Sequence, residues 1–201
     1  MKVIAVTQRV DTGATYNERR DALDQTWTNF LSACGILFIP VPNDPQSAEY
    51  LVQSLDIAGV LFTGGNDLVS CEGDAPERDA TESRLFDWAR ERQLPLLGVC
   101  RGMQVIQHQL GVPLKKVDGH VGNRHDIEID NETRSTNSFH NFAAFETVDG
   151  LSIVAKSSDG VIEAIRHDRE NILGIMWHPE RDDPFDPNDI DMFQTFYGVE
   201  A

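Results

Sequence analysis

The stretch Leu97-Gly98-Val99-Cys100-Arg101-Gly102-Met103-Gln104 follows an apolar run that is typical of a buried strand. Glycines lie two residues before and two residues after Cys100, which is the spacing of a sharp turn from a strand into a helix that carries a nucleophile. Such a turn needs glycine because a side chain would collide where backbone passes close to backbone. The cysteine then lies beside the first free amides of a helix, which favour a thiolate and a developing oxyanion. The sequence therefore predicts covalent chemistry at Cys100.

Apolar runs alternate with helical patterns on both sides of this turn. The predicted strands are 3–7, 36–41, 58–62, 95–99, 148–155, 161–167 and 172–177, and the predicted helices are 17–34, 47–55, 77–92, 101–110 and 188–197. In the polar segment 118–138, Ile127 and Ile129 alternate with charges, which predicts short antiparallel strands. The alternation predicts an α/β fold, a doubly wound, mostly parallel sheet with helices on both faces, in a single domain over residues 1–201.

Composition limits the partners and the location of the chain. Its formal net charge is -16, which disfavours binding to nucleic acid or to acidic membranes. Three widely spaced cysteines offer no disulfide framework, and the N-terminal apolar run is too short for a signal peptide, so a reducing, cytoplasmic setting is expected. Neither a metal nor an organic cofactor is expected, because His120, His125 and Asp126 fit no strong metal motif and indicate a polar loop.

Functional residues should gather at the carboxyl ends of the parallel strands, where sites form in such sheets. His178 follows the strand 172–177 directly, and Glu180 lies two residues later, on the same side of an extended segment. Cys100, His178 and Glu180 are therefore predicted to act as nucleophile, base and orienting carboxylate in acyl transfer or hydrolysis. Taken singly, the cysteine fits a core position and the histidine a capped strand end, but their coincidence at strand ends favours a site.

A developing oxyanion needs two preorganised donors. The backbone amide of Arg101, at the start of the helix 101–110, is predicted to be one of them. The Gly64-Gly65 turn after the strand 58–62 is predicted to supply the other, through Gly65. Glycine in that turn allows the backbone to approach a substrate closely.

These residues resemble a known family, the class I glutamine amidotransferases, in the segments 64–65, 98–104, 158–164 and 177–180. The resemblance covers nearly the whole chain, from the first strand to about Arg181. It implies a flavodoxin-like α/β fold and a Cys-His-Glu triad of Cys100, His178 and Glu180. It also implies a small-molecule substrate with a γ-glutamyl amide bond, which the cysteine attacks to give a γ-glutamyl thioester that water hydrolyses.

Within the family, Arg101 and the run Asn137-Ser138-Phe139-His140-Asn141 are similar to stand-alone γ-glutamyl hydrolases. By this resemblance Gly64, Gln104, Asn137, Ser138, Phe139 and His140 bind the glutamyl group, with Gln104 and the backbone around Ser138 at its α-amino and α-carboxylate groups. The segments 7–9, 64–68, 137–142 and 174–178 further resemble hydrolases of γ-glutamyl-CDP-amidate, which act in capsule phosphoramidate biosynthesis. A diphosphate leaving group would need nearby cations, and Arg9, Arg101 and Arg124 are the candidates.

Three alternatives stay open from the sequence. The first is a γ-glutamyl-γ-aminobutyrate-type hydrolase of polyamine breakdown. The second is a glutaminase subunit that supplies ammonia to a synthase partner. The third is a non-catalytic sensor of a γ-glutamyl ligand, against which the complete set of triad residues argues. The sequence also leaves open whether the chain forms a homodimer.

Overall fold

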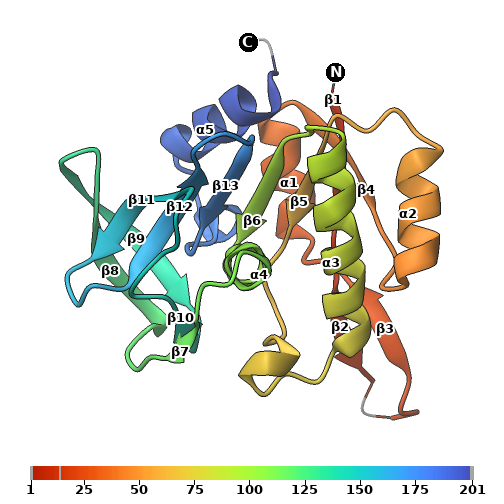
Figure 1. Cartoon of the computed structure of the whole chain (residues 1–201), viewed down its shortest axis with the longest axis horizontal. Coiled ribbons are helices and arrows are strands. Elements are labelled where there is room, and N and C mark those ends of the chain that lie inside the picture. Colours follow the sequence, from red (N-terminus) through yellow and green to blue (C-terminus); the bar gives the residue numbers. More distant parts are fainter. Residues whose placement is uncertain (1, 14, 200–201) are drawn as a thin grey trace.

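A nine-stranded sheet in the order β4-β1-β5-β6-β13-β12-β11-β8-β9 forms the centre of the computed structural model, which describes residues 2–13 and 15–199 (Figure 1). Its parallel half consists of β1 (Lys2–Val6), β4 (Ile36–Pro40), β5 (Gly59–Phe62), β6 (Leu96–Val99) and β13 (Ile172–Ile175). Its antiparallel half consists of β8 (Val121–Ile129), β9 (Glu132–Phe139), β11 (Leu151–Ser157) and β12 (Ile162–His167), of which β12 pairs with β13. Two small sheets pair β2 (Arg9–Thr12) with β3 (Arg19–Ala22) and β7 (Lys115–Lys116) with β10 (Phe142–Ala143).

Helices cover both faces of the sheet, each over its own apolar core. The helices α2 (Pro45–Gln53), α3 (Pro76–Glu91) and α4 (Arg101–Gln109) contribute Val52, Leu85 and Met103 to one core. The helices α1 (Thr26–Ala33) and α5 (Pro187–Tyr197) contribute Phe30 and Phe193 to the other. The predicted fold class is confirmed, with the refinement that the sheet is mixed, since its pairings from β13 to β9 are antiparallel.

The predicted helix 17–34 was too long. Residues Arg19–Ala22 form β3 instead, and α1 begins only at Thr26, whose amide donates to the Asp24 carboxylate at 3.0 Å. The apolar spacing of Ala22 and Trp27 imitates a helix, but Arg19 turns outward and its guanidinium donates to Glu77 on α3 at 2.7 Å. The hairpin of β2 and β3 therefore lies beside α3 rather than continuing α1 (Figure 1).

The register of the parallel strands brings three chain segments to one edge of the sheet. Gly98 of β6 lies opposite Phe62 of β5 and Gly174 of β13, and all three strands run in the same direction. The turns that follow β5, β6 and β13 therefore leave the sheet side by side. None of the helices in the described segments combines the length and the apolar character that a membrane crossing requires.

Candidate active site

Cys100 occupies the turn between β6 and α4 in a backbone conformation that side chains rarely adopt. Its φ is 53° and its ψ is -107°. The turn is tight because a Cβ on Gly98 would lie 2.4 Å from the carbonyl carbon of Gly102, and one on Gly102 would lie 2.2 Å from the oxygen of Phe62. The two glycines around Cys100 are thus required by close backbone contacts, as the spacing predicted. The amide of Cys100 donates to Ile175 of β13 at 2.7 Å, which fixes the turn to the neighbouring strand.

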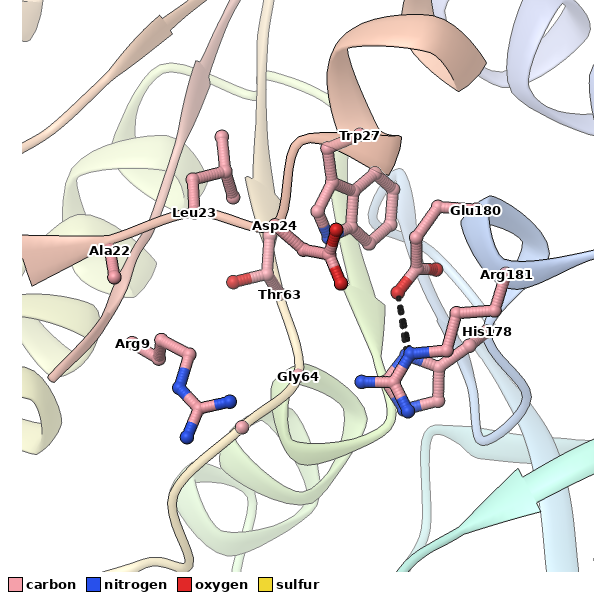
Figure 2. Close-up of a pocket in the computed structure, with 11 residues that line it drawn as sticks. Arg9, Ala22, Leu23, Asp24, Trp27, Thr63, Gly64, His178, Glu180 and Arg181 are labelled. Carbon is pink, nitrogen blue, oxygen red and sulfur yellow. Dashed lines mark hydrogen bonds and ion pairs between the residues drawn. The ribbon is translucent and has the colours of Figure 1, made fainter. Parts of the chain in front are cut away.

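His178 follows β13 at the same edge and is 1% exposed. Its Nδ1 lies 2.7 Å from Oε1 of Glu180, which is also buried (Figure 2). The ring packs against Gly64, where a Cβ would lie 2.5 Å from Cε1, and meets the ring of Phe139 at an angle of 85°, with 5.7 Å between the two ring centres. The imidazole is therefore held on three sides, by a carboxylate, a bare backbone and an aromatic ring.

The charges around His178 favour its protonated form. Burial alone would lower the pKa of His178, but the negative charges of Cys100 and Glu180 and the hydrogen bond to Glu180 outweigh burial and raise this pKa to about 9. An imidazolium between a thiolate and a carboxylate is the charge arrangement of an activated cysteine nucleophile. The other two cysteines differ, because burial raises the pKa of the Cys34 thiol to about 12 and also raises that of Cys71.

The two predicted oxyanion donors are chain neighbours of residues already placed at this site: Arg101 follows Cys100, and Gly65 follows Gly64, which packs against His178. Arg101 is the first residue of α4, so its amide is one of the helix donors that lack an intrahelical acceptor. Gly65 has a φ of +83°, a conformation that favours glycine. Their role as donors stays a prediction.

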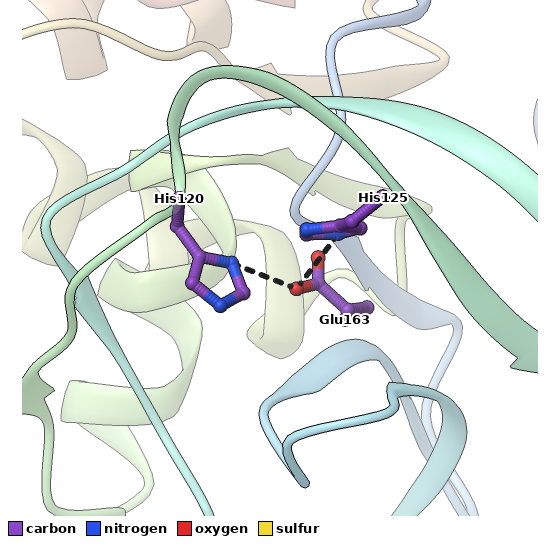
Figure 3. Close-up of side chains that lie close together, drawn as sticks. All are labelled: His120, His125 and Glu163. Carbon is purple, nitrogen blue, oxygen red and sulfur yellow. Dashed lines mark ion pairs between the residues drawn. The ribbon is translucent and has the colours of Figure 1, made fainter.

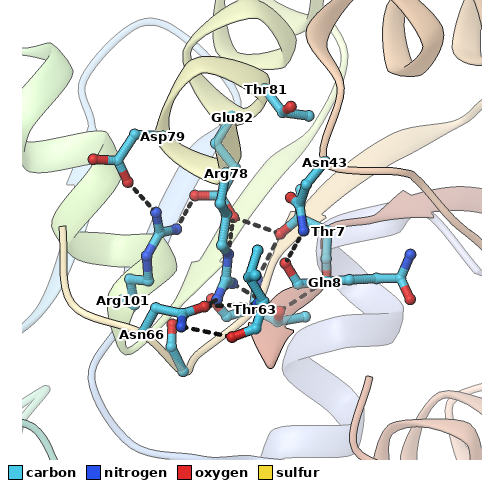
Figure 4. Close-up of polar contacts among 12 residues, drawn as sticks. Thr7, Gln8, Asn43, Thr63, Asn66, Arg78, Asp79, Thr81, Glu82 and Arg101 are labelled. Atoms are coloured by element: carbon cyan, nitrogen blue, oxygen red, sulfur yellow. Dashed lines mark hydrogen bonds and ion pairs between the residues drawn. The ribbon is translucent and has the colours of Figure 1, made fainter. Parts of the chain in front are cut away.

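Arg78 of α3 is a residue of this region that the sequence analysis missed. Its side chain is fully buried and donates to the carbonyls of Thr63 at 2.8 Å and Gly65 at 2.5 Å (Figure 4). Its Nε also donates to Glu82 at 3.1 Å, and Glu82 accepts from Thr7 at 2.7 Å. Spacing alone suggests an exposed i,i+4 ion pair on a charged helix, so no sequence signal marked Arg78 as a support of the Gly64-Gly65 turn.

The side chain of Arg101 points into the same network rather than towards the cysteine. It bonds to the carboxylates of Glu82 and Asp79 and is 1% exposed (Figure 4). Burial would raise the pKa of Glu82, but Arg101 and Arg78 outweigh it and hold that pKa below its usual range. Arg101 is therefore not a free cation for a diphosphate. Arg124, whose guanidinium bonds to Asp182 at 2.7 Å, does not line the pocket formed beside His178 and Glu180.

The side chain of Asn137 lies next to the triad and bonds to the backbone of His178. Its Oδ1 accepts from the amide of His178 at 2.8 Å, and its Nδ2 donates to the carbonyl of His178 at 2.9 Å and to Asp182 at 3.1 Å. With both amide atoms used in this way, the side chain fixes the backbone that carries His178. A glutamyl contact by this side chain stays a prediction.

The other predicted glutamyl-binding side chains make contacts within the protein, and their role in binding a glutamyl group stays a prediction. Gln104 is 2% exposed, and its Nε2 donates to Phe142 at 2.8 Å. Ser138 is buried, with its hydroxyl donating to the carbonyl of His120 at 2.8 Å. Phe139 contacts His178 as described, whereas His140 is buried in a separate cluster with His120 and Glu163. Of these side chains, Phe139 is the one whose ring reaches the triad.

Arg9 is the predicted cation that does face the site. A pocket beside His178 is lined by Arg9, Asp24, Trp27, Gly64, His178 and Arg181, among others (Figure 2). Asn66 places Arg9, because its side chain makes two hydrogen bonds, of 2.8 and 2.9 Å, with the backbone of Val10. Arg9 pairs with Asp11 at 2.7 Å and is about half exposed, so its guanidinium remains open to a ligand. Arg181, which sequence reasoning did not single out, adds a second guanidinium at the pocket.

His125 lies within the strand β8 rather than in a polar loop as expected, whereas His120 lies in the loop that directly precedes β8. Both meet Glu163 of β12, and the ligand atoms of the three residues lie within 4.8 Å of one another. Asp126, the third residue considered from the sequence, is not part of this group.

The comparisons with known proteins agree with this architecture. Residues 20–197 match the family model "Glutamine amidotransferase class-I". The chain is 32% identical over 199 residues to a γ-glutamyl-CDP-amidate hydrolase from Campylobacter jejuni, covering 98% of both chains. It is 30% identical over 155 residues to a glutamine-hydrolysing GMP synthase from Dictyostelium discoideum, covering 70% of this chain and 20% of that protein.

A crystal structure of a glutamine amidotransferase from Thermotoga maritima has the same fold, with a TM-score of 0.70 at 15% identity, covering 99% of this chain and 86% of the other. The family match spans the β5 turn, the cysteine elbow after β6 and the histidine after β13. The chain belongs to the class I glutamine amidotransferase family.

Proposed function

We propose that this chain is a thiol hydrolase of γ-glutamyl amides in which Cys100 is the nucleophile. The observation that carries the proposal is the buried His178–Glu180 pair, 2.7 Å apart, at the same sheet edge as a cysteine in a strained strand–helix turn. Strain at a single non-glycine residue of this kind is typical of functional positions. The raised pKa of His178, caused in part by Cys100, supports a working thiolate–imidazolium pair.

The chemistry follows from these positions. The Cys100 thiolate attacks the γ-carbonyl carbon, and the amides of Gly65 and Arg101 hold the oxyanion. His178 gives its proton to the leaving nitrogen as the C–N bond breaks, which leaves a γ-glutamyl thioester. His178 then takes a proton from water, the hydroxide attacks the thioester, and glutamate leaves as the thiolate is restored. Glu180 holds the ring so that Nε2 faces the reacting atoms.

For the substrate we propose γ-glutamyl-CDP-amidate. The similarity to the Campylobacter jejuni hydrolase extends over 98% of both chains, so the two proteins match over nearly their whole lengths. Arg9 and Arg181 line the pocket beside His178, and guanidinium groups recognise phosphate well. A diphosphate offers these two guanidinium groups more acceptor oxygens than the single carboxylate of γ-aminobutyrate does.

The experiment is a steady-state comparison of purified protein on γ-glutamyl-CDP-amidate, γ-glutamyl-γ-aminobutyrate and glutamine, with glutamate release as the common readout. We expect the highest kcat/KM on the first substrate and no turnover in Cys100→Ala, while Cys71→Ala, at a cysteine outside the site, keeps full activity. A preference for γ-glutamyl-γ-aminobutyrate would overturn the substrate. Glutamine hydrolysis that appears only with an added synthase would identify an ammonia-supplying subunit, and retained turnover in Cys100→Ala would refute the nucleophile.

A further inference from the structure

Three histidines and a glutamate from distant parts of the chain meet beneath the β8–β9 hairpin. His120 precedes β8, His125 lies within β8, His140 follows β9 and Glu163 belongs to β12. Figure 3 shows His120 and His125 on either side of the Glu163 carboxylate. His120 and His140 are each 3% exposed and Glu163 is 1% exposed, so the group is closed to water except beside His125.

The histidine nitrogens in this group lie close to the Glu163 carboxylate but are not hydrogen-bonded to it. Oε1 of Glu163 lies 3.2 Å from Nε2 of His125, 3.5 Å from Nδ1 of His120 and 3.7 Å from Nε2 of His140. Among the described residues, neither oxygen of Glu163 has a hydrogen-bond partner, and Nε2 of His125 and of His140 have none. A buried carboxylate without a partner is costly, so the arrangement calls for a positive charge at its centre.

The hydrogen bonds that His120 and His140 make on the side away from Glu163 show which of their ring nitrogens carry a lone pair towards it. Nδ1 of His140 donates to the carbonyl of Phe142 at 3.2 Å, which leaves Nε2 unprotonated towards Glu163 in the neutral ring. Nε2 of His120 donates to the carboxylate of Asp159 at 2.9 Å, so in the neutral ring Nδ1 carries the lone pair and lies 3.5 Å from Oε1 of Glu163 and 3.4 Å from the hydroxyl oxygen of Ser138. Lone pairs aimed at a carboxylate repel it, and a carboxylate or carbonyl behind a histidine is the usual support of a metal ligand.

We propose that His120, His125 and Glu163 bind one divalent transition-metal ion, with His140 as a fourth ligand. Histidine and carboxylate donors are those that zinc takes in proteins, at about 2.0–2.2 Å, and a tetrahedron of that size separates its ligand atoms by roughly 3.3 Å. The observed separations from Glu163 Oε1 are 3.2 to 3.7 Å, close to that spacing, and the ligand atoms of His120, His125 and Glu163 all lie within 4.8 Å of one another. His140 lies outside that group, so it must move inward to complete the tetrahedron. Four protein ligands in a buried position are typical of a structural site without an open coordination position.

The ion would join the antiparallel half of the sheet to the active-site edge. It ties both strands of the β8–β9 hairpin to β12, and β9 carries Asn137 and Phe139, which hold the backbone and the ring of His178. The metal site is separate from the proposed hydrolysis, because none of its ligands contacts Cys100, His178 or Glu180 through a hydrogen bond or ion pair in the described residues.

The test uses cobalt(II) as the probe in the full-length chain, treated with a chelator and carrying Cys100→Ala. That substitution removes the active-site thiolate, which could itself bind a metal together with His178. We expect about one cobalt ion per chain, with the visible absorption of a four-coordinate site and without a thiolate charge-transfer band. Adding Glu163→Gln should weaken cobalt binding at least ~10- to 100-fold. His108→Ala, an exposed histidine on α4, should leave binding unchanged.

Circular dichroism of each variant checks that it folds. If Glu163→Gln unfolds the chain, His125→Ala is used in its place, because His125 is the partly exposed ligand and its removal disturbs the core least. The same loss of cobalt binding is expected. Any one of three results overturns the proposal: no stoichiometric cobalt binding in Cys100→Ala, equal cobalt binding in the ligand variants and in His108→Ala, or a cobalt spectrum without the bands of a four-coordinate site. The first of these would mean that a proton, and not a metal ion, lies between His125 and Glu163.

Discussion

His178 combines burial with two negative neighbours, and its protonation links the proposed chemistry to stability. Its pKa of about 9 lies above the 6.5 of an unperturbed histidine, so the folded protein binds this proton more tightly than the unfolded chain. The resulting stabilisation is complete below about pH 6.5 and is lost as the pH rises through about 9.

We expect Cys100→Ala to lower the pKa of His178, because the charge of Cys100 is the largest influence that raises it. NMR titration of the His178 ring in the wild type and in the variant measures the change directly. The His108 ring, exposed on α4, serves as the internal control. Equal titration of His178 in both proteins would show that the cysteine does not carry a thiolate beside it.

Arg9 is the residue at which specificity for an anionic substrate can be tested. Arg9→Gln removes a partly exposed guanidinium from the pocket, and hydrogen bonds to charged groups contribute about 1.5–3 kcal/mol. We therefore expect KM for γ-glutamyl-CDP-amidate to rise roughly 10-fold or more, with glutamine hydrolysis unaffected. Arg20→Gln, in β3 and paired with Glu18, is the matched control. Equal losses on both substrates would instead indicate a role in folding the hairpin.

The turn after β5 depends on the helix α3, which presents Arg78 to two of its carbonyls. Arg78→Met removes these bonds and leaves Glu82 with one guanidinium partner fewer in a buried position. Breaking a buried ion pair in this way costs about 3–5 kcal/mol of stability. Loss of an oxyanion donor typically lowers kcat by about 10²–10³. We expect kcat of Arg78→Met to fall by at most this factor, because the variant misplaces the turn that carries Gly65.

The double variant Arg78→Met/Glu82→Gln separates these two effects. Removing the stranded charge should recover part of the free energy of unfolding, measured with urea, whereas kcat should stay low because the turn is still unsupported. Recovery of kcat together with stability would show that Arg78 matters only for the charge balance of the helix.

The parallel elements were predictable because their strands are continuous apolar runs, buried on both faces. The hairpin of β2 and β3 was not, because Ala22 and Trp27 have helical spacing and only the contact of Arg19 with α3 decides otherwise. Cys100, His178 and Glu180 could be assigned to one edge because each follows or lies near the end of a strand. Arg78, Asn137 and Glu163 act through contacts between distant segments, which no local spacing reveals.

At the scale of the whole molecule, the net charge of -16 opposes the approach of an anionic substrate. Salt shortens the Debye length from about 30 Å at 0.01 M to about 8 Å at 0.15 M, so the distant acidic groups are screened first. We expect kcat/KM for γ-glutamyl-CDP-amidate to rise a few-fold over this range, while kcat/KM for glutamine, which has no net charge, stays level. A fall with salt would mean that attraction by the local arginines dominates the approach.

The contrast among the three cysteines gives a way to count working molecules. Cys34 and Cys71 are buried and their raised pKa values keep them as unreactive thiols near neutral pH, whereas Cys100 lies beside an imidazolium. A small alkylating reagent such as iodoacetamide should therefore add a single label per native chain, seen by intact-mass spectrometry, and label uptake should match the loss of glutamate release. Two or three rapid additions, or full turnover after one, would contradict this selectivity.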